Sequence, residues 1–179
     1  IYYGDTARVP YGGKDKNTII RYSLEALEFY KNFDIDMLIV ACNTASAFAI
    51  AELQEVANIP VVGVIAPGVI AVKENIANKD AKILVIATKG TVSTNKYANA
   101  LANEGYTNVI SRATGLFVPI VEEGIFEGAV LDATMDYYFK DLKDVDAVIL
   151  GCTHFPHIEE KIAAYFHGCK TIHSGNAIV

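Results

Sequence analysis

Short, predominantly apolar runs recur along the chain and are separated by longer segments of mixed character. Such runs are typical of strands buried in a parallel sheet. Polar or turn-forming residues bound each run, so we expect a strand at each place. The predicted strands are DMLIVA (36–41), PVVGVI (60–65), AKILVIA (81–87), TNVISR (107–112) and AVILG (147–151).

The segments between these runs have the apolar spacing of helices. After the glycine-rich turn VPYGGKD, residues 16–33 place Ile20, Leu24 and Leu27 on one stripe. The same criterion predicts further helices over 44–57, 67–77, 92–104, 117–140 (with a break near Gly128) and 156–167.

The regular alternation of strand and helix predicts an α/β fold. Predominantly apolar strands indicate parallel sheets that are covered by helices on both faces. In such sheets, ligands bind beyond the carboxyl ends of the strands. The residues directly after each strand are therefore the candidates for chemistry.

Two of the predicted strands end in the same pattern. DMLIVACNTA (36–45) and DAVILGCTHF (146–155) each have an Asp, an apolar run and a cysteine followed by Asn-Thr or Thr-His. This weak repeat predicts two similar α/β lobes with a cleft between them, each presenting a thiol. A lone cysteine such as Cys169 is usually structural. The matched pair, Cys42 and Cys152, is instead expected to straddle a small ligand.

A thiol on each side of a ligand suits the inversion of a carbon centre. One group removes a proton from one face while its partner delivers a proton to the other. A free thiol has a pKa near ~8.5, which a helix N-terminus lowers. Asn43 or Thr44 is expected to cap the helix after Cys42, and Pro156 to occupy the first turn after Cys152. The helix dipoles should then favour the thiolate and attract a substrate carboxylate.

Composition and charge exclude several other classes. The chain has 179 residues, of which 52% are hydrophobic, so it can bury a core and is not disordered. No apolar run reaches the roughly 20 residues of a membrane helix, and no signal-peptide pattern begins the sequence, so we expect a cytoplasmic protein. A net charge of -6 without a Lys/Arg cluster argues against a nucleic-acid partner. Three widely spaced cysteines do not predict a disulfide framework.

The residues also carry a family resemblance. YYGDTARVPYG, ACNTAS, GVIAPG, ATKGTV, FVPIVEEG and GCTHFP, in that order, resemble glutamate racemases of the aspartate/glutamate racemase superfamily. The likeness covers essentially the whole chain, and VPYG together with GCTHFP points to the glutamate branch. It implies a homodimer that interconverts L-glutamate and D-glutamate without a cofactor. The D-glutamate would supply bacterial peptidoglycan synthesis.

The resemblance implies a role for each matching residue. Cys42 would remove the α-proton of D-glutamate, and Cys152 that of L-glutamate. Glu122 and His154 would support the second thiol. The matching substrate contacts are Tyr11, Gly12, Asn43, Thr44, Thr88, Thr91, Thr153 and His154. No metal is expected, since CTHFPH lacks a fourth protein ligand for zinc.

The predicted lobes divide the chain unequally. Residues 1–65 form the first lobe, which is expected to be completed by residues from about 174 onward, and 66–173 form the second. Racemases of this family usually begin with a strand and an Asp-Ser pair, and this chain starts downstream of that motif. IYYGD is interpreted as the end of a strand, so we expect a fragment that lacks the Asp-Ser segment and the C-terminal end.

Three other functions stay open at this point. A cysteine hydrolase would use Cys152 as nucleophile and His154 as base, although Cys42 would then have no role. A non-catalytic small-ligand binding protein with two lobes would share the same fold. An aspartate racemase is the nearest rival, because a pocket discriminates one methylene by only ~1–3 kcal/mol.

Overall fold

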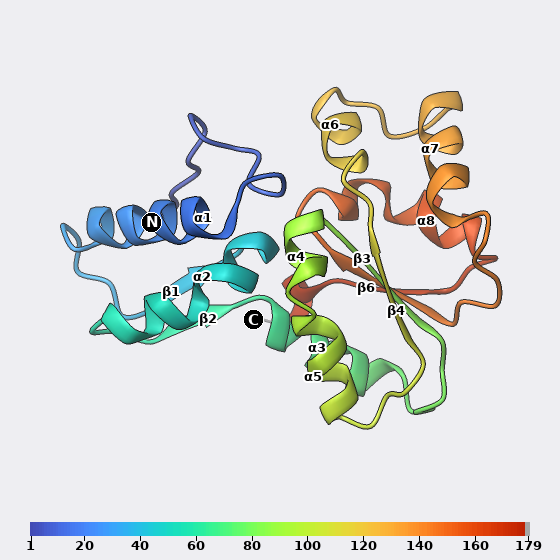
Figure 1. The fold of residues 1–179 in the computed structure, drawn as a ribbon, viewed down its shortest axis with the longest axis horizontal. Coiled ribbons are helices and arrows are strands. Elements are labelled where there is room, and N and C mark those ends of the chain that lie inside the picture. Colours follow the sequence, from blue (N-terminus) through green and yellow to red (C-terminus); the bar gives the residue numbers. More distant parts are fainter. Residues whose placement is uncertain (178–179) are drawn as a thin grey trace.

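The computed structural model describes residues 1–177 as two groups of elements that lie side by side (Figure 1). One group contains a two-stranded sheet, and the other a four-stranded sheet. Every strand pair in the two sheets is parallel. The predicted α/β fold with parallel sheets is therefore confirmed.

The first group packs two helices on its small sheet. Strands β1 (Leu38–Val40) and β2 (Val61–Gly63) pair in register, with Leu38 opposite Val61. Helix α2 (Asn43–Val56) packs against both strands, and α1 (Lys16–Tyr30) packs against α2 and contributes Leu27 to the same core. The core of the group consists of Leu27, Leu38, Ala49, Leu53 and Val61. The apolar stripe predicted for α1 is confirmed, because its members contact this core.

The prediction that every sheet is covered on both faces is wrong for this small sheet. The side chain of Ile39, in the middle of β1, is 49% exposed. Alternate residues of a strand point to opposite faces. Within residues 1–177, therefore, only the face that carries Leu38 is well buried.

The second group is built on a sheet with strand order β4-β3-β5-β6. Its strands are β3 (Ile83–Ala87), β4 (Val109–Ala113), β5 (Ala147–Gly151) and β6 (Lys170–Ile172). The two central strands, β3 and β5, are buried at every residue. Its α-helices are α3 (Ile65–Asn75), α4 (Lys89–Ser93), α5 (Lys96–Asn103), α6 (Phe117–Glu122), α7 (Ala129–Phe139) and α8 (Glu159–Tyr165). Two 3-10 helices are η1 (Phe155–Ile158) and η2 (Ser174–Ala177).

Helices cover both faces of this larger sheet (Figure 1). Leu84 and Ile86 of β3 pack into one core with residues of α6, α7 and α8. Ile83 and Val85 of the same strand pack into another core with residues of α3 and α5. The period of two along a buried strand explains this division. None of the helices in residues 1–177 has the length and apolar character needed to span a membrane.

Differences from the predicted elements occur at turns and at the chain ends. The helix predicted over 92–104 is interrupted at Asn95, which has a φ of 54° and separates α4 from α5. The predicted break near Gly128 is confirmed, with a φ of 92° that favours glycine. Strand β6 was not predicted, because its short sequence KTI has no sustained apolar pattern. The strand expected at IYYGD is absent from the described residues.

The central position of β3 predicts how the fold responds to truncation of its core. Ile86→Ala should lower the free energy of unfolding by about 2–5 kcal/mol, because Ile86 is fully buried and its loss leaves a cavity. Ile70→Ala is the matched control, since Ile70 is 48% exposed and its loss should cost about 0.5 kcal/mol or less. Urea unfolding followed by circular dichroism measures both. Equal losses would contradict this description of the core.

Candidate active site at the ends of β1 and β5

Both paired cysteines follow strands, as predicted. Cys42 lies two residues after β1, and Cys152 directly follows β5. Both positions are at the carboxyl ends of parallel strands, where ligands bind in α/β proteins. Cys42 is partly exposed, and Cys152 is 7% exposed. Cys169 lies away from these strand ends and packs against the core beneath α7 and α8.

The predicted helix caps are right for one cysteine and wrong for the other. Cys42 itself is the N-cap of α2, and its carbonyl accepts the Ser46 N–H at 2.9 Å. Asn43 and Thr44 are the first helical residues, so neither side chain caps the helix. Pro156 lies in the first turn of η1, as predicted.

One tyrosine contacts the neighbours of both cysteines. The Tyr97 hydroxyl donates to Asn43 Oδ1 at 2.7 Å, directly after Cys42 in the chain. The Tyr97 ring lies against Gly151, directly before Cys152, where a Cβ would stand 3.3 Å from Tyr97 Cε2. The two cysteine-bearing segments are therefore brought together around this side chain.

Three threonines form a buried cluster that joins α2 to α4. The Thr44 hydroxyl oxygen lies 2.9 Å from that of Thr88 and 3.3 Å from that of Thr91, and the last two are 3.1 Å apart. Thr88 is the N-cap of α4 and accepts the Thr91 N–H. Gly12 lies against this cluster, since a Cβ at Gly12 would be 2.4 Å from Thr88 Cγ2. Four of the predicted substrate contacts therefore meet at one place.

The second thiol has a polar chain beside it. Cys152 Sγ is 3.6 Å from His154 Nδ1, and His154 Nε2 contacts the Glu122 carboxylate at the end of α6. Thr153, between them in sequence, is exposed. The structure thus brings His154 and Glu122 together beside Cys152, as the resemblance implied.

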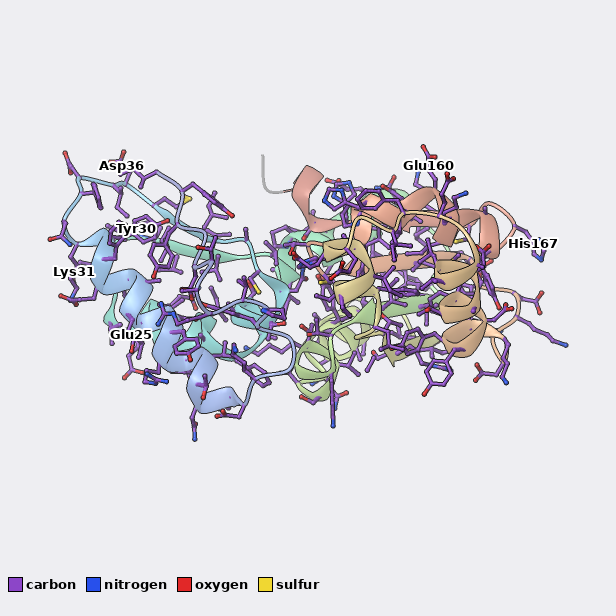
Figure 2. All side chains as sticks on the ribbon, turned by 90° about the horizontal axis from the view of Figure 1, so that it is seen from above. Glu25, Tyr30, Lys31, Asp36, Glu160 and His167 are labelled. Carbon is purple, nitrogen blue, oxygen red and sulfur yellow. The ribbon has the colours of Figure 1, made fainter. Side chains whose placement is uncertain are left out.

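Tyr11 is held by residues that sequence reasoning did not select. Its hydroxyl donates to the Asp5 carboxylate, which also accepts Arg8 Nε at 2.7 Å. Arg8 pairs in addition with Glu25 of α1, which Figure 2 labels, and donates to the Tyr3 hydroxyl at 3.0 Å. Asp5 and Arg8 lie within the quoted motif YYGDTARVPYG, so their position in it was an available signal. For Tyr97 the sequence offered no comparable signal.

Comparisons with known proteins identify the family. The whole chain, residues 1–179, matches the Asp/Glu/Hydantoin racemase family. The chain belongs to this family. The glutamate racemase of Nitratiruptor sp. is 59% identical over 180 residues, which cover 100% of this chain and 71% of that protein. The glutamate racemase of Campylobacter jejuni is 58% identical over 181 residues, which cover 100% of this chain and 72% of that protein. The resemblance drawn from the motifs is therefore confirmed.

Solved structures of family members have the same fold. The crystal structure of glutamate racemase from Campylobacter jejuni superposes with a TM-score of 0.97 at 56% identity, over 99% of this chain and 71% of that one. Glutamate racemase from Aquifex pyrophilus gives a TM-score of 0.84 at 43% identity, over 99% of this chain and 69% of that one. Aspartate racemase from Picrophilus torridus, at 18% identity, shares only the fold.

In this family member, burial controls the ionisation of both thiols. Burial raises the pKa of Cys42 and raises that of Cys152 to about 12, with the charge of Cys42 adding to the second shift. Backbone N–H groups after each cysteine act in the opposite direction, as expected at helix starts. The helix starts thus act on the thiols in the predicted direction, but desolvation outweighs them, so the net pKa of each thiol is raised.

A separate cavity of about 710 Å³ lies at the other end of the larger sheet. Its lining includes Lys140, Val145 and His167, and Val145 precedes β5 whereas Cys152 follows it. The cavity and Cys152 therefore lie at opposite ends of β5. This cavity therefore contains none of the predicted site residues.

The raised pKa of Cys152 predicts slow, pH-dependent alkylation. Between pH 7 and pH 10, its rate of reaction with iodoacetamide should rise about tenfold per pH unit, because only the thiolate reacts and its fraction grows until the pKa is reached. Timed quenching and mass spectrometry of the Cys152 peptide measure this rate. A rate that levels off below pH 9 would show that the thiolate forms without substrate.

Proposed function

We propose that this chain interconverts L-glutamate and D-glutamate by acid/base chemistry between Cys42 and Cys152, without a cofactor. The proposal rests on the match over the whole chain to proteins named glutamate racemase, at 52–59% identity. It is supported by the two cysteines, which follow equivalent strands and flank the Tyr97 contact. The protein is accordingly an isomerase that acts on an amino acid.

In the proposed reaction, one cysteine gains a proton and the other gives one up. With D-glutamate, the Cys42 thiolate takes the α-proton, and the electron pair stays on the α-carbon and its carboxylate. The Cys152 thiol then donates its proton to the opposite face, which gives L-glutamate. Cys42 is now the thiol and Cys152 the thiolate, so the protein is ready for the reverse reaction.

The site must stabilise both a thiolate and a developing carbanion. The ammonium group of glutamate brings a positive charge that favours a buried thiolate nearby. The hydroxyls of Thr44, Thr88 and Thr91 are placed to donate to a substrate carboxylate, where charge develops. His154, which contacts both Cys152 and Glu122, supports proton transfer at the second thiol. Tyr11, Gly12, Asn43 and Thr153 complete the proposed substrate contacts.

We further propose the cellular setting and the assembly that the resemblance implies. The D-glutamate formed would enter peptidoglycan synthesis, and the protein would act in the cytoplasm as a homodimer. The lobe boundary at residue 65 is also proposed, with the site between the two lobes. Its support is that Val61 of β2 packs into the core of the smaller group, whereas Val69 of α3 packs into the core of the larger sheet. The completion of the first lobe by residues from about 174 onward is likewise a proposal, since η2 contacts α3 of the larger group.

One observation also favours a second candidate. The contacts from Cys152 to His154 and from His154 to Glu122 form the nucleophile, base and orienting acid of a cysteine hydrolase. Family membership and the matched Cys42 favour racemisation instead. A covalent intermediate trapped on Cys152 would support the hydrolase.

Proton NMR in D2O tests the reaction and its substrate together. Purified protein should exchange the α-proton of L-glutamate and D-glutamate for deuterium and form the opposite enantiomer, with no added cofactor. Aspartate, which is one methylene shorter, should exchange about 10–200 times more slowly. Exchange of aspartate alone would make the substrate assignment wrong. If neither amino acid exchanges, a non-catalytic binding protein becomes the better description.

Replacing either thiol tests the two-thiol mechanism. Cys42→Ser and Cys152→Ser should each lower the turnover of glutamate by about 10²–10⁴-fold or more, because a serine hydroxyl is a far weaker acid at the same place. Cys169→Ser is the matched control and should keep normal turnover, since Cys169 lies outside the site. Circular dichroism checks that all three variants are folded. Near-normal turnover in either site variant would exclude the mechanism.

A further inference from the structure

Tyr97 is a buried residue whose hydroxyl forms a hydrogen bond from the larger group of elements to the smaller one. It belongs to α5 of the larger group, and its ring is 3% exposed. Its hydroxyl donates to Oδ1 of Asn43, the first residue of α2 in the smaller group, at 2.7 Å. Asn43 is 4% exposed and follows Cys42. This hydrogen bond therefore fixes a polar group beside the first thiol.

Glycines on two sides of the ring hold Tyr97 in place. A Cβ at Gly68 of α3 would lie 3.2 Å from both the Tyr97 hydroxyl oxygen and Cε1. A Cβ at Gly151, at the end of β5, would lie 3.3 Å from Tyr97 Cε2 and 2.9 Å from the Ile86 carbonyl oxygen. Larger residues would force the ring aside. The ring is thus packed closely, and the direction of its hydroxyl is set by the fold.

The hydroxyl in turn decides which end of the Asn43 amide faces outward. Burial raises the pKa of Tyr97, so its hydroxyl keeps a proton that needs an acceptor. Asn43 Oδ1 is that acceptor, whereas the Ser174 side chain beside the hydroxyl lowers the pKa of Tyr97 and so acts on it as a donor. An amide has one acceptor end and one donor end, so the NH2 group points away from Tyr97. Among residues 1–175, whose side chains the structure describes, no side chain or backbone group forms a hydrogen bond with this nitrogen.

We propose that Tyr97 is a positioning residue for substrate binding, which holds the Asn43 amide so that its NH2 group donates to a carboxylate of glutamate. This inference rests on the proposed function and deepens it. A reversed amide would present an oxygen to the carboxylate and repel it. The orientation therefore selects for an anionic group beside Cys42.

Tyr97→Phe tests this role, with Tyr106→Phe as the matched control. Tyr106 is also buried, at 1% exposed, but its hydroxyl donates to the Ile76 carbonyl at 2.6 Å, at the end of α3. Tyr97→Phe should raise KM for both enantiomers about tenfold with kcat changed less than about threefold, as expected when ground-state binding is lost. Tyr106→Phe should leave KM within about twofold. Thermal unfolding of both variants checks that each is folded.

A double-mutant cycle asks whether Tyr97 acts through Asn43. If it does, adding Tyr97→Phe to Asn43→Ala should raise KM less than about twofold beyond Asn43→Ala alone. A full additional tenfold rise would mean that Tyr97 acts elsewhere, and the proposal would be wrong.

Asn43→Asp keeps the proposal testable should Tyr97→Phe fail to fold. The aspartate retains an acceptor for the Tyr97 hydroxyl but replaces the donor with an anionic oxygen. KM should then rise at least tenfold. An unchanged KM in this variant would overturn the proposal.

The outcomes separate this inference from the proposed function. Wild-type protein that exchanges no α-proton would contradict the racemase function itself. An active wild type in which Tyr97→Phe behaves like Tyr106→Phe would contradict only the positioning role. A fall in kcat with KM unchanged would assign Tyr97 to the proton transfer at Cys152, and would also overturn the proposal.

Discussion

The candidate site depends on a few buried hydroxyl contacts between the two parallel sheets. The Tyr97 to Asn43 hydrogen bond and the cluster of Thr44, Thr88 and Thr91 join α2 to α4 and α5. Within residues 1–177, each sheet presents one cysteine after the carboxyl end of a strand, Cys42 after β1 and Cys152 after β5. Because buried polar groups are costly without partners, these contacts hold the two strand ends in one relative position.

Burial has two opposing consequences at this site. It raises the pKa of both cysteines, which favours the thiol form of each. The same low polarity strengthens every interaction with a charged substrate once it is bound. In the proposed racemase, one thiol loses its proton to solvent as glutamate binds, because the ammonium group of the substrate supplies a compensating positive charge. This arrangement limits the reaction of a free thiolate with other molecules.

Ion pairs and a hydrogen bond hold the loop before α1, which carries two of the proposed substrate contacts. Asp5 accepts from both Tyr11 and Arg8, and Arg8 reaches Glu25 on α1. The neighbouring Gly12 packs on Thr88 so closely that no side chain fits between them. The loop is thereby tied to both groups of elements, which places Tyr11 and Gly12 with the threonine cluster.

The sequence by itself determined the α/β class, the parallel strands and the positions of Cys42 and Cys152 after strands. The spacing of hydrophobic residues and the position of a residue after a strand are local features, so they can be recognised in a single sequence. It also contained the motifs that identify the family. Sequence missed β6 and the interruption at Asn95, because short polar segments carry little periodic signal.

Only the tertiary structure decided which polar side chains meet. Asn43 and Thr44 were expected to cap a helix, yet they bind Tyr97 and Thr88, which are 54 and 44 residues away in the chain. Burial raises the pKa of both thiols more than the helix starts lower it, and this balance depends on how closely the fold surrounds each sulfur. Desolvation and long-range hydrogen bonds arise from packing between distant segments, and no local pattern records them.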